Sequence, residues 1–202
     1  MAREWLETGV AYALVEAALW SQGRLQEVLI ATAWIWVLAA ILLRWPSLET
    51  LGLGGRGLVA SLWVVAAAGL LGAALLLLGN AAGTRHGTLN PTRVLFYVTW
   101  GLTQQFLAQS FFFLRFERLL AHRGGAVGLT AVLFAVAHLP NPVLTPLTFA
   151  MALLFGFAFA RHRNLYPLAV AHALLGSAAS MAFPESLLHH MRVGLGYFRF
   201  TG

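Results

Sequence analysis

Apolar runs follow one another along the whole chain, and short polar or turn-forming stretches separate them. Most of the runs approach the roughly 20 residues that a helix needs to cross the hydrocarbon core of a bilayer. A shorter first run lies within residues 1–23 and is interrupted by Glu16, so we interpret it as an interfacial or re-entrant helix or a short first span. The pattern predicts an all-α polytopic transmembrane helix bundle of six to seven membrane segments. The other expected segments are residues 27–43, 57–79, 92–114, 126–139, 143–160 and 165–183.

The composition strengthens the membrane interpretation. Of the 202 residues, 59% are hydrophobic and 10% are charged, whereas a soluble domain carries about 25% charged residues. All thirteen basic residues are arginine, and they gather at the ends of apolar runs, where loop charge and lipid headgroups favour them. The net charge of +6 therefore points to a lipid bilayer and not to nucleic acid. The chain has neither cysteine nor aspartate, which excludes a thiol nucleophile and a catalytic aspartate pair.

The arginines also indicate an orientation. Five of them follow segments 92–114 and 143–160, whereas the turn after segment 126–139 carries no charge. Because short cytoplasmic loops are enriched in arginine, we expect the two arginine-rich loops on the cytoplasmic side. An arrangement of six spans places four other arginines on the opposite side: Arg3, Arg24, Arg192 and Arg199.

Polar side chains occur inside three of the expected spans. Gln105 and Gln109 are four residues apart and share one face of a helix, with Gln104 beside them. Two later segments each carry one histidine, His138 and His172. Polar groups within spans usually face a cavity or a partner, so we expect the three segments to close around one polar site. Alternatively, each group only joins neighbouring helices, since such hydrogen bonds contribute about 0.6–2 kcal/mol each.

The known classes of intramembrane protease can be compared with these residues. A zinc protease of the common type needs HExxH, which is absent, and an aspartyl protease needs the missing aspartates. The nearest candidate for a serine nucleophile is Ser177, which follows Gly176 close to His172, but the pattern GxSG is absent. The remaining class is a protease in which a glutamate and a histidine together activate a water.

Metal binding stays open at this stage. A zinc site formed by His138, His172 and one member of the pair His189-His190 is conceivable, but the spacing matches no recurring zinc motif. We interpret His189-His190 as an interfacial pair and expect no cofactor.

From Thr92 to about Phe183 the chain resembles the CAAX protease and bacteriocin-processing (CPBP, or ABI) family of intramembrane endopeptidases. The family pattern is EExxxR on one span, FxxxH on the next, and HxxxN or HxxxD on a later one. The corresponding stretches are QQFLAQ at 104–109, FAVAH at 134–138 and HALLG at 172–176. The resemblance implies that the first glutamate and the FxxxH histidine activate a water, and that the last histidine and the asparagine stabilise the oxyanion.

The chain departs from the pattern at all four supporting positions. Gln104 and Gln105 replace the glutamates, Gln109 replaces the arginine, and Gly176 replaces the asparagine. An amide does not accept a proton at neutral pH, although it can position a water or donate to an oxyanion. The replacements together exchange a buried charge network for a neutral one, which indicates a maintained polar site with altered or absent proteolysis.

On this basis we assign expected roles. His138 is the expected water-activating base, because its unperturbed pKa lies near 6.5, and His172 is the expected oxyanion partner. Gln104, Gln105 and Gln109 are expected to orient them. Glu16, inside the first apolar run, is an alternative source of the missing carboxylate.

The sequence thus predicts three parts: N-terminal membrane segments at 1–91, a four-helix CPBP-like core at 92–183 and an interfacial tail at 184–202. The expected protein is an integral membrane endopeptidase of a bacterial cytoplasmic membrane, acting on a membrane-embedded or lipidated peptide. The first alternative is a non-catalytic relative that binds membrane peptides or proteins, as an immunity or chaperone-like factor. The second is a small transporter or channel component.

Overall fold

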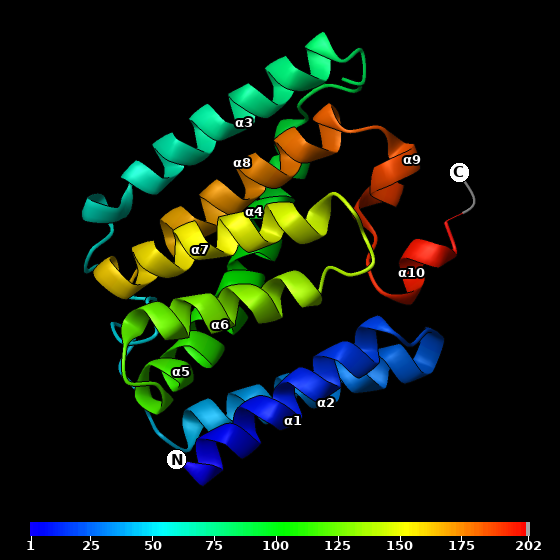
Figure 1. Cartoon of the computed structure of the whole chain (residues 1–202). Coiled ribbons are helices and arrows are strands. Elements are labelled where there is room, and N and C mark those ends of the chain that lie inside the picture. Colours follow the sequence, from blue (N-terminus) through cyan, green and yellow to red (C-terminus); the bar gives the residue numbers. More distant parts are fainter. Residues whose placement is uncertain (201–202) are drawn as a thin grey trace.

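A computed structural model describes residues 1–200, and this part of the chain is helical, without β-strands (Figure 1). The prediction of an all-α bundle is confirmed. Two short 3₁₀ turns, η1 and η3, occur at Val59–Ser61 and His189–Met191. The α-helices are α1 (Ala2–Leu19), α2 (Gly23–Leu42), α3 (Trp63–Ala81), α4 (Pro91–Gln105), α5 (Leu114–Leu119), α6 (Arg123–Val136), α7 (Leu144–His162), α8 (Tyr166–Ala182), α9 (Glu185–Leu188) and α10 (Leu195–Phe198).

Three helical stretches are long and apolar enough to cross a membrane: α2, residues 59–81 (η1 with α3) and α7. The α6 helix is apolar but shorter. Large apolar side chains point away from the bundle, among them Ile35 at 69% exposure and Leu70 at 75%. Such a surface is unfavourable in water and suits lipid, so the protein is an integral membrane protein.

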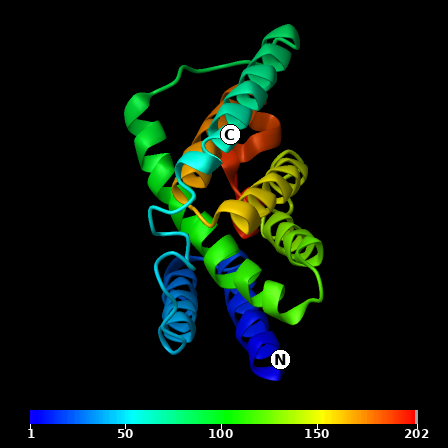
Figure 2. The ribbon, with the colours of Figure 1, turned by 90° about the vertical axis from the view of Figure 1, so that its left-hand side faces the viewer.

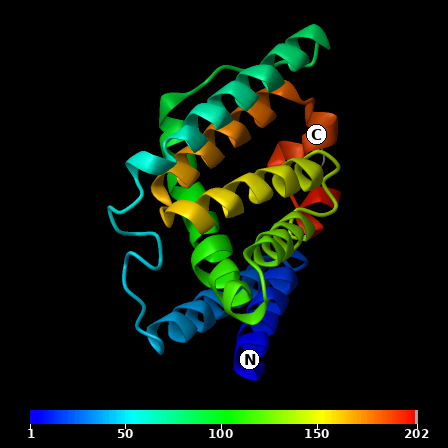
Figure 3. The same ribbon diagram turned by 60° about the vertical axis from the view of Figure 1, so that its left-hand side comes forward.

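The glutamine-bearing helix is one continuous rod. It begins at α4, where Pro91 occupies the first turn and the Asn90 side chain accepts a hydrogen bond from the Arg93 backbone at 3.2 Å. It continues through η2 (Phe106–Phe113), which is a π-helix, and ends with α5. This rod crosses the other long helices (Figure 3). We expected the segment to end near Leu114, but α5 extends it to Leu119.

Two groups of helices pack around this rod: the α1–α2 hairpin, and the helices α3, α6, α7 and α8. The closest pairs are α3 with α8, α6 with α7, α4 with α8, and α1 with α2. The α1–α2 hairpin meets the remainder of the bundle mainly through η2 and α5 and lies apart from α3 and α8 (Figure 2). Fully buried phenylalanines from η2 and α7 form the centre of the apolar core, for example Phe113 against Phe159, whose ring centroids are 5.8 Å apart.

The turn between α6 and α7 is held by Asn141, which is fully buried. Its side-chain oxygen accepts a hydrogen bond from the Leu144 backbone N–H at 2.9 Å and so caps the start of α7. Its amide nitrogen donates to the Leu188 carbonyl at 2.9 Å, which fixes the C-terminal tail to this turn. Thr145 donates to the His138 carbonyl at 3.1 Å, so the same turn fixes the position of His138.

At the opposite end of the bundle, an ion cluster gathers around Glu7. The buried Arg115 donates to the Glu7 carboxylate at 3.0 Å, Arg3 donates at 2.9 Å, and Arg44 also pairs with it. Burial alone would raise the pKa of Glu7, but the hydrogen bonds from Arg44, Arg115 and Arg3 outweigh it, and the pKa is lowered. Our placement of Arg3 on the side opposite the arginine-rich loops is therefore wrong. The carboxylate of Glu7 draws the N-terminus to the end where α5 carries Arg115.

Candidate active site

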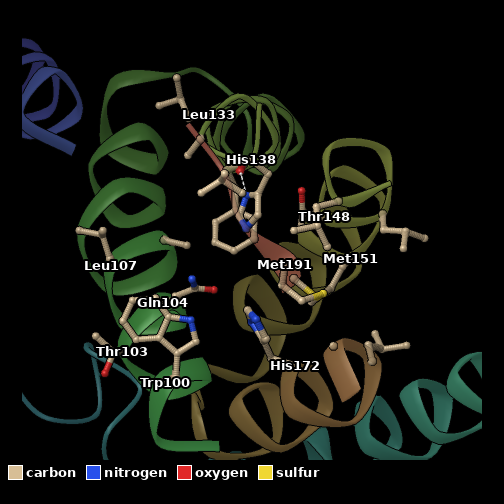
Figure 4. A pocket seen from close by; sticks show the side chains of 18 of the residues that line it. Trp100, Thr103, Gln104, Leu107, Leu133, His138, Thr148, Met151, His172 and Met191 are labelled. Atoms are coloured by element: carbon tan, nitrogen blue, oxygen red, sulfur yellow. Dashed lines mark hydrogen bonds between the residues drawn. The ribbon is translucent and has the colours of Figure 1, made fainter. Parts of the chain in front are cut away.

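A cavity of about 940 Å³ lies between the helices, and Gln104, His138 and His172 face it from three different elements (Figure 4). Apolar side chains form most of its wall, and no charged side chain from residues 1–200 lines it. Helices α1, α2 and α3 contribute apolar residues, so the cavity extends from the polar site toward the N-terminal helices.

His138 lies just after α6, in the turn held by Asn141. Its Nδ1 is 2.6 Å from the Phe134 carbonyl oxygen one turn earlier (Figure 4). A carbonyl oxygen can only accept, so Nδ1 carries the proton and donates. Nε2 of the neutral ring is therefore the nitrogen with a free lone pair. This is the form that a histidine needs in order to take a proton from a water.

His172 in α8 is held in the opposite form. The Gln105 Nε2 lies 3.2 Å from His172 Nδ1, and the Gln105 Oε1 accepts a hydrogen bond from Gln109 Nε2 at 3.3 Å. Because the Gln105 amide nitrogen can only donate, His172 Nδ1 is the acceptor and Nε2 carries the proton. The ring, which is only 4% exposed, lines the cavity as a hydrogen-bond donor.

The three glutamines divide into two kinds. Gln104 lines the cavity, but its Oε1 is buried and has no hydrogen-bond partner within residues 1–200. Gln105 and Gln109 do not line the cavity and are each only 1% exposed. They share one face of the rod, as expected, and form a relay behind His172. The structure thus brings three of the five predicted residues to the cavity and places the other two behind it.

A model of the family described as type II CAAX prenyl endopeptidase, Rce1-like, matches residues 86–177. Residues 86–177 belong to the Rce1-like CAAX protease family. All three motif stretches of the sequence analysis lie within this match. The comparisons with curated proteins and with solved structures gave no match.

Several residues considered earlier do not line the cavity. Glu16 and Ser177 are not among its lining residues. His189 stacks on Tyr197 with ring centroids 4.0 Å apart, in the C-terminal tail. Within the part of the chain that the structure describes, no three His, Asp or Glu side chains come together in a way that could hold a metal ion.

One lining residue of the Rce1-like core escaped the sequence analysis. Tyr97 in α4 lines the cavity, and its ring centroid is 5.7 Å from that of His172. It precedes Gln104 by seven residues, or two helical turns, and so shares a face with it. This spacing, together with a hydroxyl in an apolar segment, was the signal that could have identified it.

Proposed function

We propose that this protein is an intramembrane endopeptidase that cleaves a membrane-bound or lipidated peptide. The observation that carries the proposal is the pair of histidines with opposite tautomers at one cavity in the Rce1-like region. Hydrolysis of a peptide bond needs a group that removes a proton from water and a group that donates to the oxyanion. His138 and His172 supply these two properties.

In the proposed reaction, the free Nε2 of His138 takes a proton from a water as the water oxygen attacks the scissile carbonyl carbon. The Gln104 side-chain amide, which faces the cavity from α4, orients that water. The Nε2–H of His172 donates to the oxygen on which negative charge develops. When the C–N bond breaks, the His138 imidazolium returns its proton to the leaving amine.

Gln105 and Gln109 act in this scheme as positioning residues. Their hydrogen bonds hold His172 in the tautomer that donates into the cavity. A glutamate at position 105 would instead accept from Nδ1–H and leave His172 Nε2 without a proton. The amide is therefore suited to the donor role of His172.

The cavity also supports a proposal for the class of substrate. Its volume of about 940 Å³ and apolar wall fit an extended peptide with an apolar or lipid chain better than a soluble polar peptide. We place the protein in a bacterial cytoplasmic membrane, with the arginine-rich end toward the cytoplasm, because that end carries Arg115 and Arg163 and their neighbours.

A second candidate function is binding without cleavage. It is favoured by the absence of any carboxylate among the residues that line the cavity. A protein of this kind would hold a membrane peptide or protein as an immunity or chaperone-like factor.

The two functions are separated by proteolysis in liposomes. Wild type, His138→Ala and the control His189→Ala, which alters a histidine outside the cavity, are incubated with membrane-anchored peptides, and products are identified by mass spectrometry. If the protein is a peptidase, wild type and His189→Ala should cleave the peptides, and His138→Ala should not. If folded wild type cleaves nothing but retains peptides, and His138→Gln retains them equally well, the protein is a binder.

A further inference from the structure

The Tyr97 hydroxyl occupies the space that a side chain at position 176 would fill. A Cβ built on Gly176 would lie 2.2 Å from the Tyr97 hydroxyl oxygen and 2.5 Å from the ring carbon that bears it. These distances are far below any real carbon contact, and the ring is rigid. Tyr97 can hold this position only because residue 176 is glycine.

A second glycine brings the two helices together at this point. A Cβ on Gly101 would lie 3.0 Å from the Ala169 carbonyl oxygen and 3.2 Å from the Cβ of His172. Gly101 follows Tyr97 by one turn of α4, and Gly176 follows His172 by one turn of α8. The close crossing of α4 and α8 therefore brings the Tyr97 ring to His172, with ring centroids 5.7 Å apart, and its hydroxyl to Gly176.

This hydroxyl is available to a ligand. Tyr97 lines the cavity, and within residues 1–200 its hydroxyl makes no hydrogen bond to another protein group. The hydroxyl oxygen is not one of the fully buried side-chain atoms that lack a hydrogen-bond partner. In an apolar cavity, an unpaired hydroxyl is costly unless a ligand or water completes its hydrogen bond.

We propose that the Tyr97 hydroxyl is a second hydrogen-bond donor to the carbonyl oxygen of the bound peptide, next to the Nε2–H of His172. This inference rests on the proposed peptide-binding function and deepens it. A phenol from α4 takes the position that the family pattern gives to an α8 side chain, and the glycine at 176 provides the space. Because a donor of this kind acts on the developing oxyanion, its loss is expected to lower kcat by about 10²–10³ with little change in KM.

The test compares Tyr97→Phe with Tyr166→Phe, a matched loss of a hydroxyl that donates to the Leu53 carbonyl outside the cavity. For each protein in liposomes, kcat and KM are measured with a cleaved peptide, and Kd is measured with a membrane-anchored peptide aldehyde, whose hydrate resembles the tetrahedral intermediate. We expect Tyr97→Phe alone to lower kcat and to weaken aldehyde binding by at least tenfold. Unchanged values in Tyr97→Phe would overturn the inference.

The exchange of positions gives an independent test. Gly176→Asn alone should lose aldehyde binding because its side chain collides with Tyr97, whereas Tyr97→Ala/Gly176→Asn should recover part of it. If the folded double variant does not recover aldehyde binding, Tyr97 and the side chain at position 176 do not compete for the same space. If wild type binds the aldehyde but cleaves nothing, the peptidase proposal fails while the Kd values still decide the role of Tyr97. If wild type binds no aldehyde, both proposals fail.

Discussion

The buried pair Gln105 and Gln109 should tolerate charged side chains only when one position carries a carboxylate and the other a cation. Gln105 and Gln109 are each 1% exposed and joined by a 3.3 Å hydrogen bond. Gln105→Glu places a carboxylate there without a cation, and Gln109→Arg places a cation there without a carboxylate. A buried charge without its partner costs about 3–5 kcal/mol, so each single variant should be destabilised by this amount. The double variant restores an ion pair.

The assay is thermal unfolding of wild type, the two single variants and the double variant in one detergent. Since about 1 kcal/mol corresponds to roughly 2–4 °C in a chain of this size, each single variant should lose roughly 6–20 °C in Tm. The double variant should lose less than the two single losses added together, with a coupling of about 3 kcal/mol or more. Gln104→Glu is the matched control, because its side chain faces the cavity and should be tolerated better.

Two results would refute this reasoning. One is a Gln105→Glu protein as stable as wild type, which would mean that the side chain reaches water. The other is a double variant whose loss equals the sum of the single losses, which would mean that residues 105 and 109 do not act on each other. Either result would also remove the basis for the His172 tautomer.

Three further predictions concern other parts of the molecule. Glu16→Gln should leave peptide cleavage unchanged, because Glu16 does not line the cavity; loss of cleavage would reinstate it as the missing carboxylate. Glu7→Gln should destabilise the protein by about 3 kcal/mol by leaving Arg115 buried without a carboxylate. Because the folded pKa of Glu7 lies below 4.5, its stabilisation is present above that pH and lost as the pH falls through the lower value, so a Tm series below pH 5 should converge with that of Glu7→Gln. Asn141→Ala should cost about 2 kcal/mol in unfolding experiments and slow cleavage, since it holds the turn that carries His138; unchanged kinetics would contradict that role.

The sequence was sufficient to predict the helices because each apolar run of span length has one stable solution in a bilayer, a helix. It was also sufficient to predict that Gln105 and Gln109 share a face, since their spacing of four residues decides this alone. That the three segments close around one polar site was expected from the polar groups inside these spans, and Gln104, His138 and His172 line one cavity.

Other features depend on contacts between distant segments, which no local pattern encodes. The side on which Arg3 lies is decided by the pairing of Glu7 with Arg115, more than a hundred residues away in the chain. The different exposure of adjacent Gln104 and Gln105 depends on how α4 packs on α8. The role of Gly176 as space for Tyr97 became visible only when the two helices were placed against each other.

The ion cluster at Glu7 has a consequence for the topology of the chain. It fixes the N-terminus at the arginine-rich end of the bundle, whereas Asn141 and Leu188 fix the C-terminal tail at the other end (Figure 1). A chain whose two termini lie at opposite faces has traversed the bundle an odd number of times. Reporter domains fused to the two ends should therefore report opposite compartments, and the pair of fusions would establish the parity and the direction of insertion together.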